Sequence, residues 1–460
     1  MKSFFYSIFL VAAIVVSGCV SIDREAQLAL TGLNTGNDIL AESWSSKLAD
    51  KSTYSRNLGA VESGRTMLLT GKYADALQRF NSAVDSAVDR TEASPRLKVA
   101  DMLNTAISAT VTDDRTREYY LPPYEVNFAL EYSILSRLLR GDRDGALVDA
   151  RLSVYVQDTL AQTYGVDIQK EQEGATDAAK NIIAEQGEAL ESLMASSRNS
   201  WENPLLWWLS GVLFEADGDT DMAWQSYRKA AAVNPGCNTF AADASRAEKI
   251  VQPASGKSRL VIIYEKDFVP QRESLKVPVP VYTGMSIDIP KYGAVAAVPS
   301  GIFVSCSQSN YLSGVAVDVR SLAARDLKEN LPGVVVRNIT RAAVQASAQA
   351  AVNASGNTYV KVGVFAVNAI VSAIRKADTR SWVTLPAVQY VWSNGEMDPG
   401  EHNIDLNVDG KTVSAKVALC PGETRILWIA QTGAIIRGAS VKASANGNFA
   451  TDLNGKEISL

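Results

Sequence analysis

Two acidic residues in the middle of the chain are spaced so that they could act together on a glycosidic bond. Glu265 and Asp267 stand two positions apart at the end of an apolar run, and glycoside hydrolysis uses a pair of carboxylates. That chemistry also requires a cleft and an aromatic platform for the sugar, and no second motif in the sequence supplies them. No Gly-x-Ser-x-Gly elbow or Walker-type phosphate loop is evident either. We therefore do not expect an enzyme.

A second cluster of residues could hold a polar ligand. Asp378, Arg380 and Trp382 stand at every second position of a short stretch. A carboxylate, a guanidinium and an indole near a helix end can together bind such a ligand. An ion pair beside a buried aromatic residue at a helix-to-strand junction would give the same sequence. We favour this structural role and keep the ligand site as the alternative.

Metal and thiol chemistry have few residues to draw on. His402 is the single histidine of the chain; it lies in a turn entering a strand, where a plain surface role is expected, and one imidazole excludes a multi-histidine metal site. Cys237, Cys306 and Cys420 are too far apart for a Cys-x-x-Cys redox site or a zinc knuckle. We expect isolated buried thiols, no metal and no cofactor.

Length and charge restrict the class of protein. A chain of 460 residues exceeds the size at which one core keeps growing, so two or more domains are expected. The 45 basic and 50 acidic residues give a net charge of -5, and no basic stripe with interleaved aromatic residues is present. Nucleic acid is therefore excluded as the expected partner.

The N-terminus has the pattern of an export signal that ends at a cysteine. Lys2 precedes an apolar run over residues 4–16, which is too short to span a bilayer, and Gly18 directly precedes Cys19. This arrangement resembles the bacterial lipoprotein signal, in which the cysteine thiol is lipidated. We expect residues 1–18 to be the signal peptide and Cys19 to carry the lipid anchor.

The position after the cysteine bears on the choice of membrane. Val20 stands where an aspartate would retain an enterobacterial lipoprotein in the inner membrane, so resemblance to that sorting rule favours the outer membrane. We expect a cell-envelope protein that is anchored through Cys19 and faces the periplasm. An ordinary signal peptide that happens to carry a cysteine, or a membrane anchor that stays attached, is the alternative.

The region that follows, residues 19–251, predicts short antiparallel helix pairs. The clearest copy contains Trp207, Gly211 and Tyr227, and the spacing of these residues resembles that of a tetratricopeptide repeat. Small residues let two helices approach closely, while bulky ones fill the space toward neighbouring pairs. The expected packing positions of three copies are Gly64 and Ala76, Gly141 and Ala146, and Gly211 and Ala223.

Stacked helix pairs leave a concave surface that binds a peptide, a partner helix or another domain of the same chain. Protein binding is therefore the default function of this region. The alternative is that the helices only brace the C-terminal part of the chain.

Beyond a linker at residues 252–257 the apolar period becomes that of strands. Asp409-Gly410 between two alternating runs predicts a type I′ hairpin. The spacing of the strands suggests a small sandwich over residues 257–460. Strands are predicted at residues 259–264, 275–282, 286–289, 314–319, 387–392, 403–408, 413–419 and 425–431.

Two helices are predicted between these strands, at residues 334–353 and 359–376. A membrane-inserting hairpin is one interpretation, but Arg337 and Arg341 interrupt the first helix below spanning length. We expect a buried helical layer against the sheet instead. The predicted fold class is α+β and multidomain: tetratricopeptide-like helical repeats, then a β-sandwich-like domain with a two-helix insertion at about 334–376.

The chain resembles a family of uncharacterised bacterial lipoproteins with tetratricopeptide-like repeats, found in Gram-negative envelopes. The resemblance implies no known activity, although some members resemble genomic companions of lipoprotein activators of peptidoglycan synthases. The third repeat copy departs from the pattern at Ser153, where alanine is expected. The matching stretches are 120–125, 141–151, 263–265 with 269–270, 290–292, and 377–382 with 385–386.

Three functions follow from these observations. The expected one is an envelope scaffold that binds a partner protein through its helical repeats. A structural or surface-assembly component is the alternative, and a hydrolase of cell-wall or glycan material, using a carboxylate such as Glu265 or Asp378, is the third.

Overall fold

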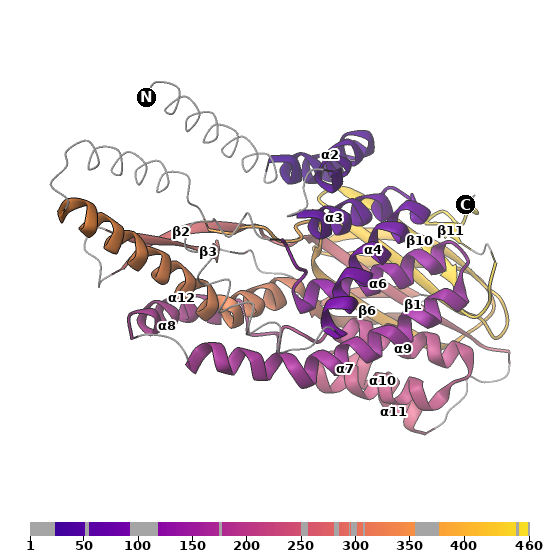
Figure 1. The fold of residues 1–460 in the computed structure, drawn as a ribbon. Coiled ribbons are helices and arrows are strands. Elements are labelled where there is room, and N and C mark those ends of the chain that lie inside the picture. The colour runs from indigo at the N-terminus through magenta and orange to yellow at the C-terminus, as the bar shows by residue number, and fades with distance from the viewer. Residues whose placement is uncertain are drawn as a thin grey trace.

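The chain folds as helices followed by a strand-rich curled sheet, so its class is α+β, as predicted (Figure 1). Residues 1–23, including Cys19, and the helix predicted at 359–376 lie outside the part of the chain that is described. Within that part no helix is long and apolar enough to cross a membrane. The computed structural model describes residues 24–50, 55–92, 118–173, 177–249, 256–279, 285–293, 295, 301–306, 309–354, 377–447 and 450–458.

Three helix pairs dominate the first half, and each turns at a glycine. Gly71, Gly141 and Gly218 have φ angles of 82°, 73° and 88°, a left-handed conformation that glycine adopts without penalty. A further helix at residues 24–35 precedes the pairs. The helices up to the linker are α2 (Asp38–Asp50), α3 (Arg56–Leu69), α4 (Tyr73–Glu92), α6 (Pro123–Leu139), α7 (Arg143–Glu173), α8 (Asp177–Glu191), α9 (Pro204–Asp217), α10 (Thr220–Val233) and α11 (Asn238–Glu248).

Glycines mark where the helices of two pairs touch. A Cβ atom at Gly64 would lie 2.8 Å from Cε1 of Phe80, and one at Gly211 would lie 2.7 Å from Cε1 of Tyr227. Since such distances are shorter than van der Waals contact, only glycine permits this approach. In the remaining pair the hydroxyl of Ser153 lies 3.0 Å from that of Ser210 on α9, so the unexpected serine makes a buried hydrogen bond between α7 and α9.

Nine strands form one sheet in the order β11-β10-β9-β1-β6-β5-β4-β7-β8, in which β1 and β9 run parallel. The sheet curls so far that its two edges come together. The amide of Lys416 on β8 donates a hydrogen bond of 2.9 Å to the carbonyl oxygen of Leu453, directly after β11. The strands are β1 (Ser258–Phe268), β4 (Gly301–Cys306), β5 (Ser309–Asp318), β6 (Pro386–Met397), β7 (Gly400–Val408), β8 (Lys411–Leu419), β9 (Thr424–Thr432), β10 (Ile435–Lys442) and β11 (Thr451–Asp452).

Alternation along β1 divides the apolar residues between two cores. Val261 and Ile263 face the helices and belong to a core that helices and sheet share. Leu260, Ile262 and Tyr264 face the inside of the curl, where they pack with residues of β4, β6, β7, β8 and β9. The helical and strand-rich segments, predicted as separate domains, therefore contribute to one hydrophobic core.

The hairpin between β7 and β8 confirms the predicted turn type. Asp409 and Gly410 have φ angles of 50° and 72°, and Val408 pairs with Lys411 across the turn. Positive φ at both central residues defines a type I′ turn, whose twist matches that of the strands.

An arm extends from the sheet, at the left in Figure 1, and has a small core of its own. It consists of α8, the two-stranded sheet β2 (Arg272–Pro278) and β3 (Ser286–Tyr292), and much of α12 (Val319–Ala354). The helix predicted at 334–353 is thus the second half of a longer one. Asp318 accepts a hydrogen bond from the amide of Ser321, which caps the earlier start.

Candidate functional site

The face of the helix pairs that lies toward the sheet holds a segment of the same chain, residues 377–385, which we call the junction segment and which turns at residues 383–385. The amide of Trp382 donates to Oε1 of Glu125 on α6 at 2.9 Å. The amide of Val383 donates to Oε1 of Glu62 on α3 at 2.6 Å. Side chains of two helices therefore bind the backbone of this segment.

The side chain of Trp382 fills the space between the helix pairs and the sheet. Its ring lies 6.1 Å from that of Phe80 and 5.9 Å from that of Tyr132, and its Nε1 donates to Oγ1 of Thr384 at 2.9 Å. The residue is fully buried. Its indole is thus part of the core rather than of an open site.

The predicted polar cluster divides into two parts. Asp378 accepts hydrogen bonds of 2.8 and 2.7 Å from Nε and Nη2 of Arg380, a two-pronged ion pair. The guanidinium also lies 5.4 Å from the ring centre of Tyr119. Asp378 and Arg380 are therefore together, whereas the indole of Trp382 lies in the core.

Sequence reasoning missed a row of buried acids on the helices that face the sheet. Burial raises the pKa of Glu62 to about 8, against hydrogen bonds from Thr384 and Val383 that lower it, and Glu125 raises it further. Burial likewise raises the pKa of Glu125 to about 7. Since an isolated ionised carboxylate is costly to bury, such groups take up protons instead.

A third acid of this row meets the sheet next to Glu265. Nε2 of Gln389 donates to Oε1 of Glu131 at 2.6 Å and to Oε1 of Glu265 at 2.9 Å. Burial, and then the charge of Glu265, raise the pKa of Glu131 to about 8. Glu265 also forms a buried ion pair with Arg65 of α3.

The carboxylates that suggested glycoside chemistry do not share a site. Glu265 lies beneath the helices in its ion pair with Arg65, whereas Asp267 has a φ of 53° and a half-exposed side chain 3.8 Å from Nζ of Lys266. The positive φ interrupts the alternation of β1 and turns Asp267 toward solvent.

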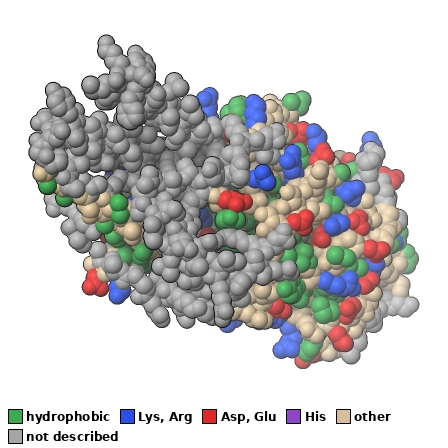
Figure 2. Space-filling model, viewed as in Figure 1, with side chains coloured by type: hydrophobic (Ala, Val, Ile, Leu, Met, Phe, Trp, Pro, Cys, Tyr) green, Lys and Arg blue, Asp and Glu red, His purple; other side chains and the backbone are tan. Residues whose placement is uncertain are grey.

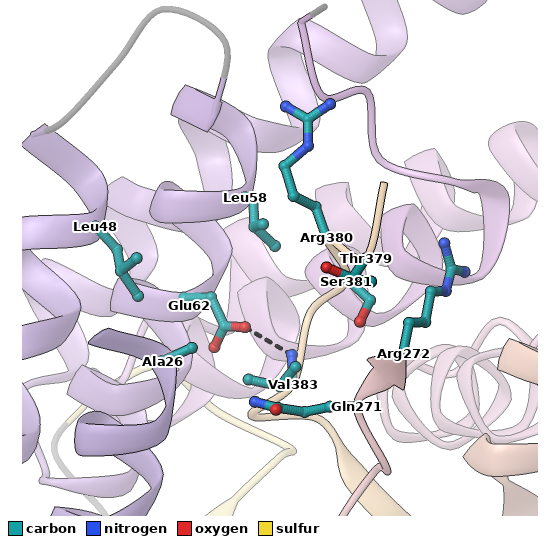
Figure 3. A pocket seen from close by; sticks show the side chains of 10 residues that line it. All are labelled: Ala26, Leu48, Leu58, Glu62, Gln271, Arg272, Thr379, Arg380, Ser381 and Val383. Atoms are coloured by element: carbon teal, nitrogen blue, oxygen red, sulfur yellow. Dashed lines mark hydrogen bonds between the residues drawn. The ribbon is translucent and has the colours of Figure 1, made fainter. Parts of the chain in front are cut away.

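One acid of the row, Glu62, borders a pocket between the N-terminal helices and the junction segment (Figure 3). The pocket has about 370 Å³ of empty volume, counting the part open to solvent. Figure 3 shows the Glu62 carboxylate in its hydrogen bond to Val383, with the guanidinium groups of Arg272 and Arg380 turned away from it. The lining residues are Ala26, Leu48, Leu58, Glu62, Gln271, Arg272, Thr379, Arg380, Ser381 and Val383.

A second ion network joins the last helices to the sheet. Arg259 of β1 pairs with Glu215 and with Asp243, the latter at 2.8 Å. Burial alone would raise the pKa of Glu215, but Arg259 and Arg246 override it and hold this pKa at about 2. Every charged member has a partner, so the network is a structural clamp.

The remaining sequence candidates are dispersed. His402 lies half-buried on β7, with Nε2 2.7 Å from the carbonyl oxygen of Asp398. Cys237 and Cys306 are buried thiols, as expected, whereas Cys420 is exposed. Among the residues that the structure describes, no cluster of three or more histidines, cysteines or acids could hold a metal ion.

The described face in Figure 2 mixes acidic and basic side chains, with apolar ones scattered between them. This mixture agrees with the small net charge of the chain. The chain matches no family model, no curated protein and no solved structure.

Proposed function

We propose that this protein is an envelope lipoprotein, anchored through Cys19 in the outer membrane, that binds a partner protein as a scaffold facing the periplasm. The Val-Ser-Gly sequence before Cys19 supports the anchor. Residue 24, the first that the structure describes, lies in a helix five residues after Cys19. A fully extended chain of that length spans at most about 18 Å, so a lipid on Cys19 would hold the folded body at the membrane surface.

We further propose that the helix pairs are diverged tetratricopeptide-like repeats and that the curled sheet is a sandwich-like module. Turn glycines at equivalent places and the close approaches at Gly64 and Gly211 support the first part. The shared interior between β1, β6 and β9 on one side and β4, β7 and β8 on the other supports the second. Because the sheet and the junction segment occupy the inner face of the helices, a partner would bind elsewhere.

The observation that carries the scaffold proposal is an apolar stripe on the outer face of α7. Val148 and Tyr155 are 60% and 51% exposed, and the half-buried Leu152 lies between them. Spacings of four and three residues place all three on one side of a helix. Exposed large apolar side chains in a row are typical of a surface that takes the apolar face of a partner helix.

Site-specific photo-crosslinking in intact cells tests this proposal. A photoreactive residue replaces Tyr155 in one variant and Leu312 in the control; Leu312 is 60% exposed on β5, so it matches in exposure but not in place. We expect one envelope protein to crosslink to position 155 and not to position 312. This crosslinked product should be absent when the chain carries Cys19→Ala. Identical products from both positions would refute the α7 surface. A Cys19→Ala chain that stays membrane-bound would refute the anchor.

A structural assembly role is the second candidate, and one pair of residues favours it. Phe303 on β4 lies directly across from Leu312 on β5, and both are more than half exposed. Crosslinks between two copies of the chain from position 312, with none to another protein from position 155, would favour assembly over the scaffold.

A further inference from the structure

The first helix, residues 24–35, and α2 form a hairpin whose two ends come together. The helices approach closely, since a Cβ atom at Gly32 would lie 2.6 Å from the backbone nitrogen of Ala41. Ala26 of the first helix belongs to the same small apolar cluster as Leu48 of α2. The last turn of α2 therefore lies beside the start of the first helix, which is the described part of the chain nearest to the proposed anchor.

One side of this hairpin is held against the rest of the protein. Arg437 of β10 donates to the carbonyl oxygen of Leu33 at 3.0 Å and to Oδ1 of Asp38 at 2.6 Å. Glu42 forms an ion pair with Lys72, in the turn that follows α3. Two acids of α2 are thus paired with cations, and these contacts fix the direction of α2 relative to the sheet and to α3.

The other side of α2 is exposed, and α2 lies at the upper edge of the molecule in Figure 1. Ile39 is 83% exposed, and Ser43 and Lys47 follow it at intervals of four residues, which places them on the same side. Nζ of Lys47 lies 3.9 Å from the ring centre of the half-buried Trp44. An exposed isoleucine with a tryptophan and a lysine is typical of a helix at the surface of a bilayer, where rings and ammonium groups lie among the headgroups.

The short reach to the anchor points to a bilayer as the occupant of this side. Residue 24 lies five residues after Cys19, and a fully extended chain of that length spans at most about 18 Å. From Lys47 back to Ile39, α2 covers eight residues, or about 12 Å along its axis. A bilayer that holds the lipid is therefore within reach of the exposed side. Lys47 and the exposed Arg24 carry the positive charge that anionic headgroups attract.

We propose that the exposed side of α2, made of Ile39, Ser43, Trp44 and Lys47, is the face on which the folded protein rests on an anionic lipid bilayer. This inference rests on the proposed lipid anchor at Cys19. A lipid on a short tether alone leaves the folded body free to rotate, whereas a helix face that also contacts the headgroups fixes one orientation. Because α2 is bound to the sheet, the whole protein takes up that orientation.

Thiol labelling of the lipidated chain tests this face. A Ser43→Cys chain is bound to vesicles of phosphatidylethanolamine and phosphatidylglycerol and treated with a water-soluble maleimide, with its own exposed Cys420 as the reference. Adding Ile39→Glu should raise the rate of labelling at position 43 relative to Cys420 on the order of tenfold, because burial of an isoleucine side chain favours the membrane contact by about that factor or more. Val148→Glu, at a 60% exposed residue of α7, is the matched control and should leave the ratio unchanged.

Equal ratios with and without Ile39→Glu would overturn the proposal, and so would an equal rise in Val148→Glu. The mass of the N-terminal peptide separates this result from a failure of the anchor. Equal ratios in a chain that carries lipid on Cys19 overturn the α2 face alone, whereas a chain without lipid overturns the anchor and the face together. Ile39→Glu should not disturb folding, since the side chain is exposed and an acid is favourable in the first turn of a helix.

Discussion

Replacing Glu131 with glutamine should stabilise the protein at alkaline pH. The folded-state pKa of Glu131 is raised from an ordinary 4.5 to about 8, first by burial and then by Glu265. A carboxyl whose pKa is higher in the folded state stabilises the fold fully below pH 4.5, and this contribution is lost as pH rises toward 8. At pH 7 the loss is about 3 kcal/mol, and glutamine has no such titration.

The neighbours of Glu131 decide how much of this gain survives. Both carboxyl oxygens accept hydrogen bonds, from Gln389 at 2.6 Å and from Asn203 at 2.8 Å. The new amide must therefore place one N–H group near a donor. In the described surroundings, Oε1 of Gln389 has no hydrogen-bond partner, so a turned Gln389 amide can accept that N–H. Turning the amide removes the hydrogen bond from Nε2 to Glu265, which offsets part of the gain. We expect a net gain of about 1 to 2 kcal/mol at pH 8.

Urea unfolding at pH 5, 7 and 9 measures this gain. The difference between Glu131→Gln and the native chain should be small at pH 5 and grow toward pH 9. Glu188→Gln, an exposed change on α8, is the control and should leave the free energy of unfolding unchanged. A variant that is less stable than the native chain at pH 9, with the same slope against pH, would refute the argument from burial.

Three further changes test the packing, the ion network and the hairpin. Gly211→Ala should cost about 1 to 3 kcal/mol of unfolding free energy in urea, because its Cβ would lie 2.7 Å from Tyr227, whereas Gly187→Ala, with its nearest contact at 3.4 Å, should be neutral or stabilising. Arg259→Met should cost roughly 1 to 3 kcal/mol, because Glu215 and Asp243 keep Arg246 but lose a buried cationic partner. It should also weaken the stability loss of the native chain as pH falls from 4.5 toward the pKa of about 2 of Glu215, as a calorimetric pH series would show. Asp409→Val should lower the melting temperature by forcing a β-branched residue to a φ of 50°, at about 1 to 2 kcal/mol. Asp409→Asn tolerates this φ and loses the ion pair with Lys266, so it should lower the melting temperature less; equal effects would contradict the turn argument.

The turns were predictable from the sequence, because each depends on residues that are adjacent in the chain. The glycine turn at Gly218 and the type I′ turn at Asp409 and Gly410 each follow from the local backbone conformation that the residue types permit. Three strands escaped prediction: β4, β10 and the two-residue β11. β4 has weakly strand-forming glycine, serine and cysteine among its six residues, and the first half of β10 lacks a buried face.

The buried acids could not be predicted as partners of the sheet. Arg65 and Glu265 are 200 residues apart, and nothing local indicates that they meet. A weaker signal was present: Glu62, Glu125 and Glu131 lie within apolar helical runs, where a charged residue is unusual unless it has a buried partner. The helical surface was expected to bind a peptide, a partner helix or another domain of the same chain, and Glu62 and Glu125 on the helices bind the backbone of the junction segment.

The hydrogen bonds from Thr432 and Arg437 to Leu33 span 399 and 404 residues. Contacts so distant along the chain form late, because a long loop must close before they can stabilise anything. Synthesis proceeds at about 5 to 20 residues per second. The ribosome therefore adds the residues of β9 and β10 that contact the first helix tens of seconds after it has made that helix. Through that interval the contacts that join the first helix to the sheet are missing, so this end of the chain completes its packing only after nearly all of the protein has been synthesised.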